Sequence, residues 1–191
     1  MNTVILDGSV DHDPWLDQAR EALLDELGGL GWQTEVLPLR EMEIGHCLGC
    51  FGCWIQTPGE CLIDDAGRDV ARAMIQSDLV VYLTPVTFGG YSSALKKALD
   101  RSICLVSPFF TQIDGEVHHR PRYARYPRCI GVGVLPEPDA ESEAIFAQLV
   151  ARNALNLHTP AHAAGVCTGE NGTDGMRARV RTLLQTVEVT P

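Results

Sequence analysis

Short apolar runs alternate along the chain with longer segments in which apolar residues recur every three or four positions. The short runs predict buried β-strands, and the longer segments predict helices with one apolar face. The predicted strands cover residues 3–6, 33–37, 79–83, 129–135 and 161–166, and the predicted helices cover residues 14–27, 65–76, 93–101, 141–155 and 173–187. This alternation is typical of an α/β protein with one parallel sheet and helices on both faces.

The length of the chain predicts one domain. A chain of 191 residues can bury a single large core, and no stretch has the composition of a linker. We therefore expect one domain over residues 1–191, with a cysteine-rich loop at 45–64 and a long insertion at 103–128. Because open α/β sheets bind ligands beyond the carboxyl ends of their strands, we expect the chemistry to gather there.

Charge and composition exclude some functions and partners. The net charge is −10, and the basic residues are spread along the chain, so we expect no nucleic-acid partner. The first residues lack a basic leader, and no apolar segment is long enough to span a bilayer, so we expect a cytoplasmic protein with no membrane partner. In that compartment seven cysteines point to metal binding or redox chemistry rather than to disulfides.

Four of the seven cysteines form a compact motif. Cys47, Cys50, Cys53 and Cys61 have the spacing C-x2-C-x2-C-x7-C. Three thiols at such short intervals can surround one centre, which favours an iron-sulfur cluster over zinc, because zinc sites usually pair two separated knuckles. Free or redox-active thiols are the other interpretation. The remaining cysteines, Cys104, Cys129 and Cys167, adjoin apolar runs and are expected in the core.

Three segments together resemble a known family. They are residues 47–65 (CLGCFGCWIQTPGECLIDD), residues 84–90 (TPVTFGG) and residues 95–101 (LKKALDR). They resemble the iron-sulfur flavoproteins and NAD(P)H-dependent FMN reductases of the flavodoxin superfamily. The resemblance implies a flavodoxin-like three-layer sandwich with a five-stranded parallel sheet in the order 2-1-3-4-5.

The resemblance also implies cofactors and the residues that hold them. It implies FMN, with Ser9 near the phosphate and the segment after the third strand at the flavin. That segment comprises Thr84, Pro85, Val86, Thr87, Phe88, Gly89 and Gly90. It implies a 4Fe-4S cluster on Cys47, Cys50, Cys53 and Cys61. Thr87 stands where relatives usually have an aromatic residue, which predicts altered flavin stacking.

The loop after the first strand departs from the family pattern. Gly8 and Ser9 are retained, but Asp11 and Asp13 follow where relatives carry polar and basic residues. One carboxylate about 6 Å from a phosphate charge costs roughly 3 kcal/mol at an effective dielectric constant of about 20. Asp13 before Pro14 also has the pattern of a helix N-cap. We therefore expect weakened FMN binding, or a phosphate held elsewhere.

The insertion at 103–128 concentrates basic and aromatic side chains. This segment suggests a lid or subunit edge that contacts flavin, a nicotinamide phosphate or a partner electron carrier through Arg120, Arg122, Arg125 and Arg128. A dimerisation arm with solvated charges is the alternative. The adjacent His118 and His119 show no carboxylate partner in the sequence, so we assign no catalytic base.

These observations together predict an FMN-dependent oxidoreductase. We expect NAD(P)H or a ferredoxin-type carrier as its electron partner and a homodimer or homotetramer as its assembly. Because flavin carries the chemistry, no catalytic side chain is assigned. The alternative is a flavin-free domain of the same fold, a binding or sensor protein that uses the cysteine loop for metal or thiol redox.

Overall fold

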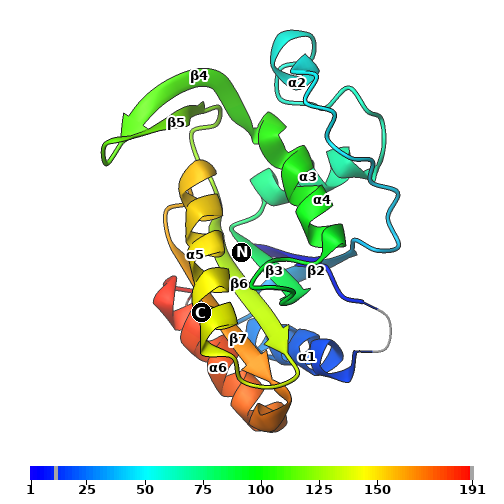
Figure 1. The fold of residues 1–191 in the computed structure, drawn as a ribbon, viewed down its shortest axis with the longest axis vertical. Helices are drawn as coiled ribbons and strands as arrows, with labels where there is room; N and C mark the ends of the chain where they lie inside the picture. The colour runs from blue at the N-terminus through cyan, green and yellow to red at the C-terminus, as the bar shows by residue number, and fades with distance from the viewer. Residues whose placement is uncertain (11–12, 190–191) are drawn as a thin grey trace.

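A computed structural model describes residues 1–10 and 13–189. Figure 1 shows a central sheet between two layers of helices, with a two-stranded arm projecting from one end. The strands are β1 (Asn2–Asp7), β2 (Gln33–Pro38), β3 (Leu79–Pro85), β4 (Val106–Ile113), β5 (Glu116–Pro121), β6 (Arg128–Leu135) and β7 (His162–Thr168). The helices are α1 (Pro14–Gly29), α2 (Gly52–Ile55), α3 (Ala66–Gln76), α4 (Ser93–Arg101), α5 (Ala140–Asn156) and α6 (Gly172–Thr186), with short 3-10 turns at Ser102–Leu105 and Gly169–Asn171.

The main sheet has five parallel strands in the order β2-β1-β3-β6-β7. Because β4 and β5 form a separate hairpin, this is the predicted order 2-1-3-4-5, and the prediction is confirmed. The order places β1 between β2 and β3, so the loops after β1 and β3 emerge side by side at the carboxyl edge. That edge is where the chain reverses its direction of winding.

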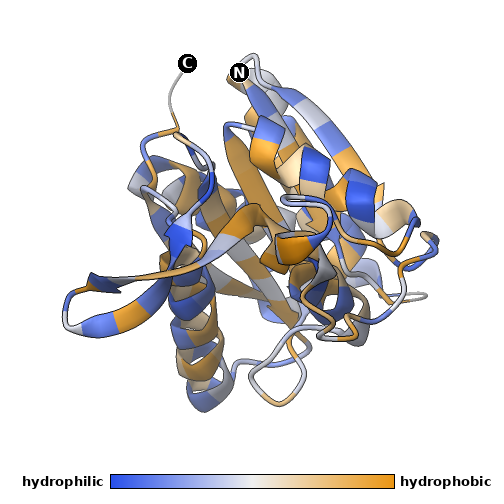
Figure 2. Cartoon of the chain, turned by 90° about the horizontal axis from the view of Figure 1, so that it is seen from above, coloured by the Kyte–Doolittle hydropathy of each residue, from blue (hydrophilic) through white to orange (hydrophobic). Residues whose placement is uncertain are grey.

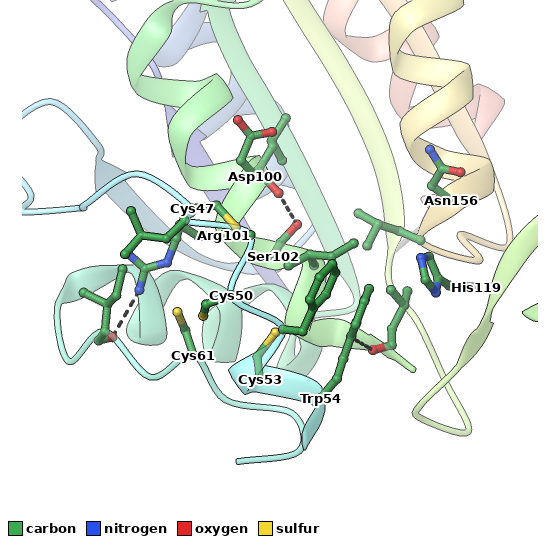
Figure 3. Close-up of a pocket in the computed structure, with 18 of the residues that line it drawn as sticks. Cys47, Cys50, Cys53, Trp54, Cys61, Asp100, Arg101, Ser102, His119 and Asn156 are labelled. Carbon is green, nitrogen blue, oxygen red and sulfur yellow. Dashed lines mark hydrogen bonds between the residues drawn. The ribbon is translucent and has the colours of Figure 1, made fainter. Parts of the chain in front are cut away.

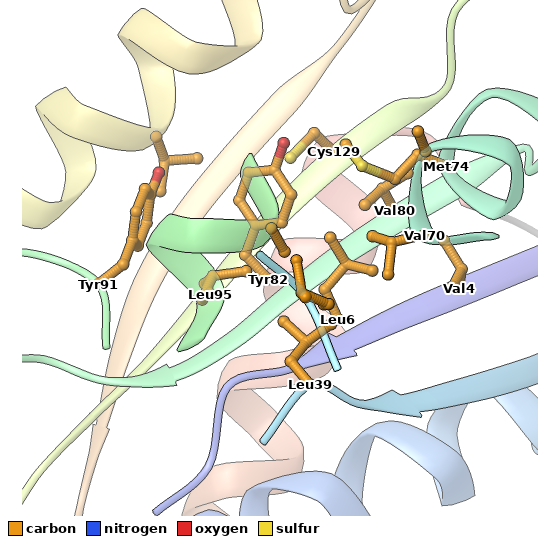
Figure 4. Packing of buried hydrophobic residues seen from close by; sticks show 14 of the residues in the cluster. Val4, Leu6, Leu39, Val70, Met74, Val80, Tyr82, Tyr91, Leu95 and Cys129 are labelled. Atoms are coloured by element: carbon orange, nitrogen blue, oxygen red, sulfur yellow. The ribbon is translucent and has the colours of Figure 1, made fainter. Parts of the chain in front are cut away.

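Apolar side chains cover both faces of the sheet. One cluster lies between the sheet and α3, α4 and α5, and Figure 4 shows part of it, with Leu6, Val80 and Tyr82 beneath the helices. The other cluster lies beneath α1 and α6. Its residues include Val180, Leu183, Leu184 and Val187, which recur at helical spacing within the predicted last helix. The alternation of strand and helix in the sequence therefore predicted both layers correctly.

The insertion at 103–128 contains two strands that the sequence analysis did not predict. β4 and β5 pair in antiparallel register and turn at Asp114 and Gly115, which have φ angles of +50° and +87°. Asp-Gly between two β-prone segments is a strong hairpin signal, and it marks this turn in the sequence. Figure 2 shows the hairpin reaching away from the body of the molecule.

The described residues contain no helix with the length and apolar character that crossing a membrane requires.

Candidate functional site

The carboxyl edge of the sheet brings the β1 and β3 loops together. Gly8 donates its N–H to the carbonyl of Leu83 at 2.8 Å. A Cβ at Gly8 would lie 2.7 Å from Oγ of Ser92 and 2.9 Å from Cβ of Leu95. Only glycine therefore lets β1 pass this close to the start of α4, and Ser9 follows directly beside the β3 loop.

The β3 loop is a rigid turn built on buried anchors. Thr84 is fully buried, and its Oγ1 accepts a hydrogen bond from the N–H of Ser92 at 2.9 Å. Thr87 and Gly90 exchange two backbone hydrogen bonds of 3.0 and 2.8 Å, which close a turn over Phe88 and Gly89. At the tip of this turn Phe88 is 99% exposed, whereas Gly89 is buried against Ile145.

The predicted helix cap at Asp13 is confirmed. Its carboxylate accepts hydrogen bonds from the N–H groups of Trp15 at 3.0 Å and Leu16 at 3.2 Å. These are the donors that a helix N-terminus offers to a phosphate. A phosphate at this end of α1 must therefore displace Asp13. Asp11, the other predicted carboxylate, lies outside the described residues.

A second carboxylate lies beneath the same loop. Asp7 is 4% exposed, and one of its oxygens accepts hydrogen bonds from both the N–H and the hydroxyl of Ser9. Its other oxygen pairs with Arg20 at 2.9 Å. The hydrogen bond and charge of Asp7 raise the pKa of Arg20 against the opposing effect of burial. Ser9 is therefore held by the protein's own carboxylate, with one guanidinium as the countercharge.

The cysteine loop does not lie at this edge, which contradicts the expectation that all the chemistry gathers there. Its thiols face the last turn of α4, which runs back along the sheet and ends at the amino edge. In Figure 1, α2 and the hairpin lie at the end opposite to the arrowheads of β6 and β7. β3 alone spans about 23 Å at roughly 3.3 Å per residue, so the two edges are well separated. The physical cause is the chain after β2, where buried Leu39 and Ile44 pack it back against the core.

All four cysteines of the motif line one cavity of about 560 Å³. Figure 3 shows their sulfurs gathered beside the end of α4. Cys47 and Cys50 are exposed, Cys61 is half-buried and Cys53 is buried. Burial, followed by the charges of the other three thiols, raises the pKa of Cys53. Among the described residues no three His, Cys, Asp or Glu side chains converge tightly enough to hold a single metal ion.

Aromatic rings form one wall of this cavity. Phe51 stacks on Trp54 with ring centroids 5.5 Å apart, and the His119 ring lies 4.8 Å from both Trp54 and Phe110. The indole N–H of Trp54 donates to the carbonyl of Val106 at 3.0 Å. The cysteine loop is therefore joined to the hairpin by contacts between aromatic rings.

Arg101 and Asp65 form an ion pair at the floor of the cavity that the sequence analysis did not assign. Both nitrogens of the guanidinium fork lie 2.8 Å from the Asp65 carboxylate, and the Arg101 side chain is 1% exposed. Asp65 also accepts a hydrogen bond from the N–H of Gly45 at 2.7 Å. A signal existed in the sequence, because Arg101 continues the buried face of its helix at the spacing of Leu95 and Ala98.

The other three cysteines lie in the core, as predicted. Burial raises the pKa of Cys104 and of Cys129 to about 12, and that of Cys167 to about 11. All three remain protonated thiols near neutral pH, so they are unsuited to nucleophilic or metal-binding roles.

The arginines of the insertion make contacts within the chain, near the hairpin and the amino edge of the sheet. Arg122 donates to the carbonyls of Cys104 and Val106, and Arg125 pairs with Asp78 just before β3. Arg128 begins β6, and Arg120 donates to the carbonyl of Phe110 within the hairpin. The guanidiniums of Arg120 and Arg122 thus bind backbone carbonyls of the hairpin and its base, away from the β3 loop.

His118 has the carboxylate partner that the sequence did not show. Its Nε2 lies 3.0 Å from Glu116, and its Nδ1 lies 3.0 Å from the side-chain oxygen of Asn156. Arg152 of α5 also binds Glu116. The buried His118 and the half-exposed Glu116 and Arg152 therefore attach the hairpin to α5, which gives His118 a structural role.

The fold is thus that of a flavodoxin-like α/β protein whose β1 and β3 loops meet at the carboxyl edge of its sheet. The chain belongs to the NADPH-dependent FMN reductase family, whose model matches residues 1–122. This confirms the family predicted from the sequence and agrees with the predicted class of FMN-dependent oxidoreductase.

Curated relatives and solved structures agree with this assignment. The chain is 36% identical to an iron-sulfur flavoprotein of Methanocaldococcus jannaschii over 83 residues, which cover 44% of the chain and 42% of that protein. It is 33% identical to an iron-sulfur flavoprotein of Archaeoglobus fulgidus over 82 residues, which cover 43% and 39%. The matches thus span about two fifths of these relatives.

Similarity to solved structures extends over nearly the whole chain. The NAD(P)H:quinone oxidoreductase of Methanothermobacter marburgensis matches with a TM-score of 0.70 and 15% identity, over 95% of this chain and 96% of that one. An FMN-dependent NADH-azoreductase of Bacillus anthracis, in complex with FMN, matches with a TM-score of 0.64 and 12% identity, over 95% and 97%. At these identities the likeness establishes the fold.

Proposed function

We propose that the chain is an FMN-dependent oxidoreductase that uses NAD(P)H or a ferredoxin-type carrier as its electron partner. The observation that carries the proposal is the adjacency of the β1 and β3 loops at the carboxyl edge, in a chain of the FMN reductase family. FMN, when bound, accepts electrons in pairs or singly, and the protein supplies position and electrostatics.

The residues at the carboxyl edge fit the ring end of FMN. The turn at Thr87–Gly90 is held in place by Thr84, and its exposed residues Thr87 and Phe88 would face a planar ring. In this role Pro85 and Phe88 form the apolar rim of the ring site, and Val86 packs in the core beneath it. At the phosphate end, Ser9 and Arg20 are the candidate ligands, and the carboxylates of Asp7 and Asp13 oppose the phosphate.

The cysteine loop fits an iron-sulfur cluster held by Cys47, Cys50, Cys53 and Cys61. Four thiols around one cavity match the ligand chemistry, and the aromatic wall supplies partly apolar surroundings. The wide ring of sulfurs suits several irons better than one ion. The names of the archaeal relatives are consistent with this part of the proposal.

The hairpin supports the expected self-association. Phe109, Phe110 and Val117 are 68%, 59% and 70% exposed on an arm that stands away from the body. A second copy of the chain is the occupant proposed for this apolar surface, in a homodimer or homotetramer.

A visible absorption spectrum of anaerobically purified protein, followed by an NAD(P)H oxidation assay with added FMN, tests the proposal. We expect flavin absorbance, and oxidation that depends on FMN. Absence of both at saturating FMN overturns it.

The second candidate is a flavin-free sensor or binding domain, favoured by Asp13 occupying the phosphate end of α1. Cysteine-bound iron without flavin or turnover in the same experiment identifies that alternative.

A further inference from the structure

Arg101 closes the two ends of the cysteine loop with four of its five N–H donors. One terminal nitrogen donates to the carbonyl of Gly45 at 3.0 Å and to Asp65 at 2.8 Å. The other donates to the carbonyl of Ile63 at 3.1 Å and to Asp65 at 2.8 Å. The guanidinium therefore joins the chain before Cys47 to the chain after Cys61, and these four hydrogen bonds fix its orientation.

The fifth donor, Nε of Arg101, is buried and has no hydrogen-bond partner among the described residues. A buried donor without a partner is rare because it loses its hydrogen bonds to water and gains no hydrogen bond within the protein. Arg101 and Cys61 line the same cavity. Figure 3 shows Cys61 beside Arg101 in the cavity.

A thiol and a thiolate differ as partners for this donor. A protonated thiol is a weak acceptor, whereas a thiolate carries full negative charge, and metal binding removes the thiol proton. The guanidinium stays charged at every accessible pH. The unpaired Nε is therefore suited to a sulfur that bears negative charge.

We propose that Nε of Arg101 donates a hydrogen bond to the Cys61 sulfur of an iron-sulfur cluster and thereby raises the reduction potential of that cluster. This inference rests on the cluster proposed above. Hydrogen bonds to sulfur and nearby positive charge favour the more negative, reduced state of a cluster. Arg101 is a tuning residue and takes no part in ligation.

The first test compares reduction potentials of anaerobically reconstituted variants. Arg101→Lys keeps the positive charge but removes the Nε donor. We expect this substitution to lower the ratio of reduced to oxidised cluster at a fixed potential about tenfold. For a one-electron couple this corresponds to a reduction potential about 59 mV lower. The matched control is Arg68→Lys, because Arg68 donates to the backbone carbonyl of Cys61 at 2.8 Å and not to the sulfur. Asp65→Asn weakens the loop clamp and leaves Nε in place.

An unchanged potential in Arg101→Lys overturns the inference, as does an equal shift in Asp65→Asn, which would show that only the clamp matters. The second test needs no substitution and so does not depend on the variant folding. Protein labelled with ¹⁵N-arginine is reduced and examined by pulsed electron paramagnetic resonance. We expect one arginine nitrogen coupled to the cluster spin, lost in Arg101→Lys.

Absence of that coupling in a cluster-loaded wild-type protein refutes the role of Arg101 alone. Absence of iron and sulfide from the reconstituted wild-type protein instead refutes the cluster itself, and the inference with it. The two failures are therefore distinguishable.

Discussion

Asp13→Ser should tighten FMN binding. The carboxylate of Asp13 caps α1 through the N–H groups of Trp15 and Leu16, which are the groups that a phosphate would use. Serine is an equally good N-cap, so the helix should keep its stability within about 1 kcal/mol. The substitution removes one negative charge from the phosphate end of the site and leaves the backbone donors in place.

The magnitude follows from Coulomb's law. Two unit charges about 6 Å apart repel by roughly 3 kcal/mol at an effective dielectric constant of about 20, and a phosphate carries a charge of between about −1.5 and −2. Asp13 is only half-buried, so solvent screening reduces the effect. We expect the Kd for FMN to fall by about 10- to 100-fold, or roughly 1.4 to 3 kcal/mol.

Flavin fluorescence quenching at low and at high ionic strength measures this change. Asp25→Ser is the matched control, because it removes the same charge from α1 about 18 Å further along the helix, at roughly 1.5 Å per residue. Its Kd should stay near that of the wild type, and added salt should narrow the gap for Asp13→Ser. An unchanged Kd in Asp13→Ser, or an equal gain in the control, would refute the electrostatic reasoning.

Three further predictions concern the thiols, the clamp and the hairpin. Brief alkylation near pH 8 of the metal-free protein, followed by peptide mass spectrometry, should label Cys47 and Cys50 and spare the buried thiols; labelling of Cys104, Cys129 or Cys167 would contradict their raised pKa values. Burial raises the pKa of Asp65 in the folded protein, but its hydrogen bonds to Arg101 and to the backbone outweigh burial and lower this pKa. The contribution of Asp65 to the stability of the fold is therefore complete above its ordinary pKa of 3.8, and it is lost as the pH falls through the lower pKa of the folded state. Asp65→Asn should therefore cost about 3 kcal/mol in urea unfolding at pH 7, and the cost should shrink below pH ~4; a constant gap would show that the carboxylate charge is irrelevant. Replacing both Phe109 and Phe110 with serine should lower the mass measured by light scattering; an unchanged oligomer would locate the interface elsewhere.

The candidate site was only partly visible in the sequence. The cysteine spacing identified four side chains that the structure does bring around one cavity, because a short loop rich in glycine keeps near neighbours together. The partner of that loop, Arg101, lies 40 residues after Cys61, and only packing of α4 against the returning chain brings them into contact. A contact between residues so far apart in the sequence produces no periodic pattern of residues from which it could be predicted.

Local pattern determined the strands, the helices and the Asp13 cap, because each depends on neighbours within a few residues. The alternation of strand and helix predicted a parallel sheet, whereas the order of its strands followed from the resemblance of three segments to a known family. Tertiary structure alone decided that the cysteines lie at the amino edge and the β1 and β3 loops at the carboxyl edge. The burial of Leu39 and Ile44 turns the chain back after β2, and the Asp65–Arg101 pair fixes it there. Such burial and ion pairing join residues that are distant in the sequence, so they depend on how the whole core packs and not on any local stretch of sequence.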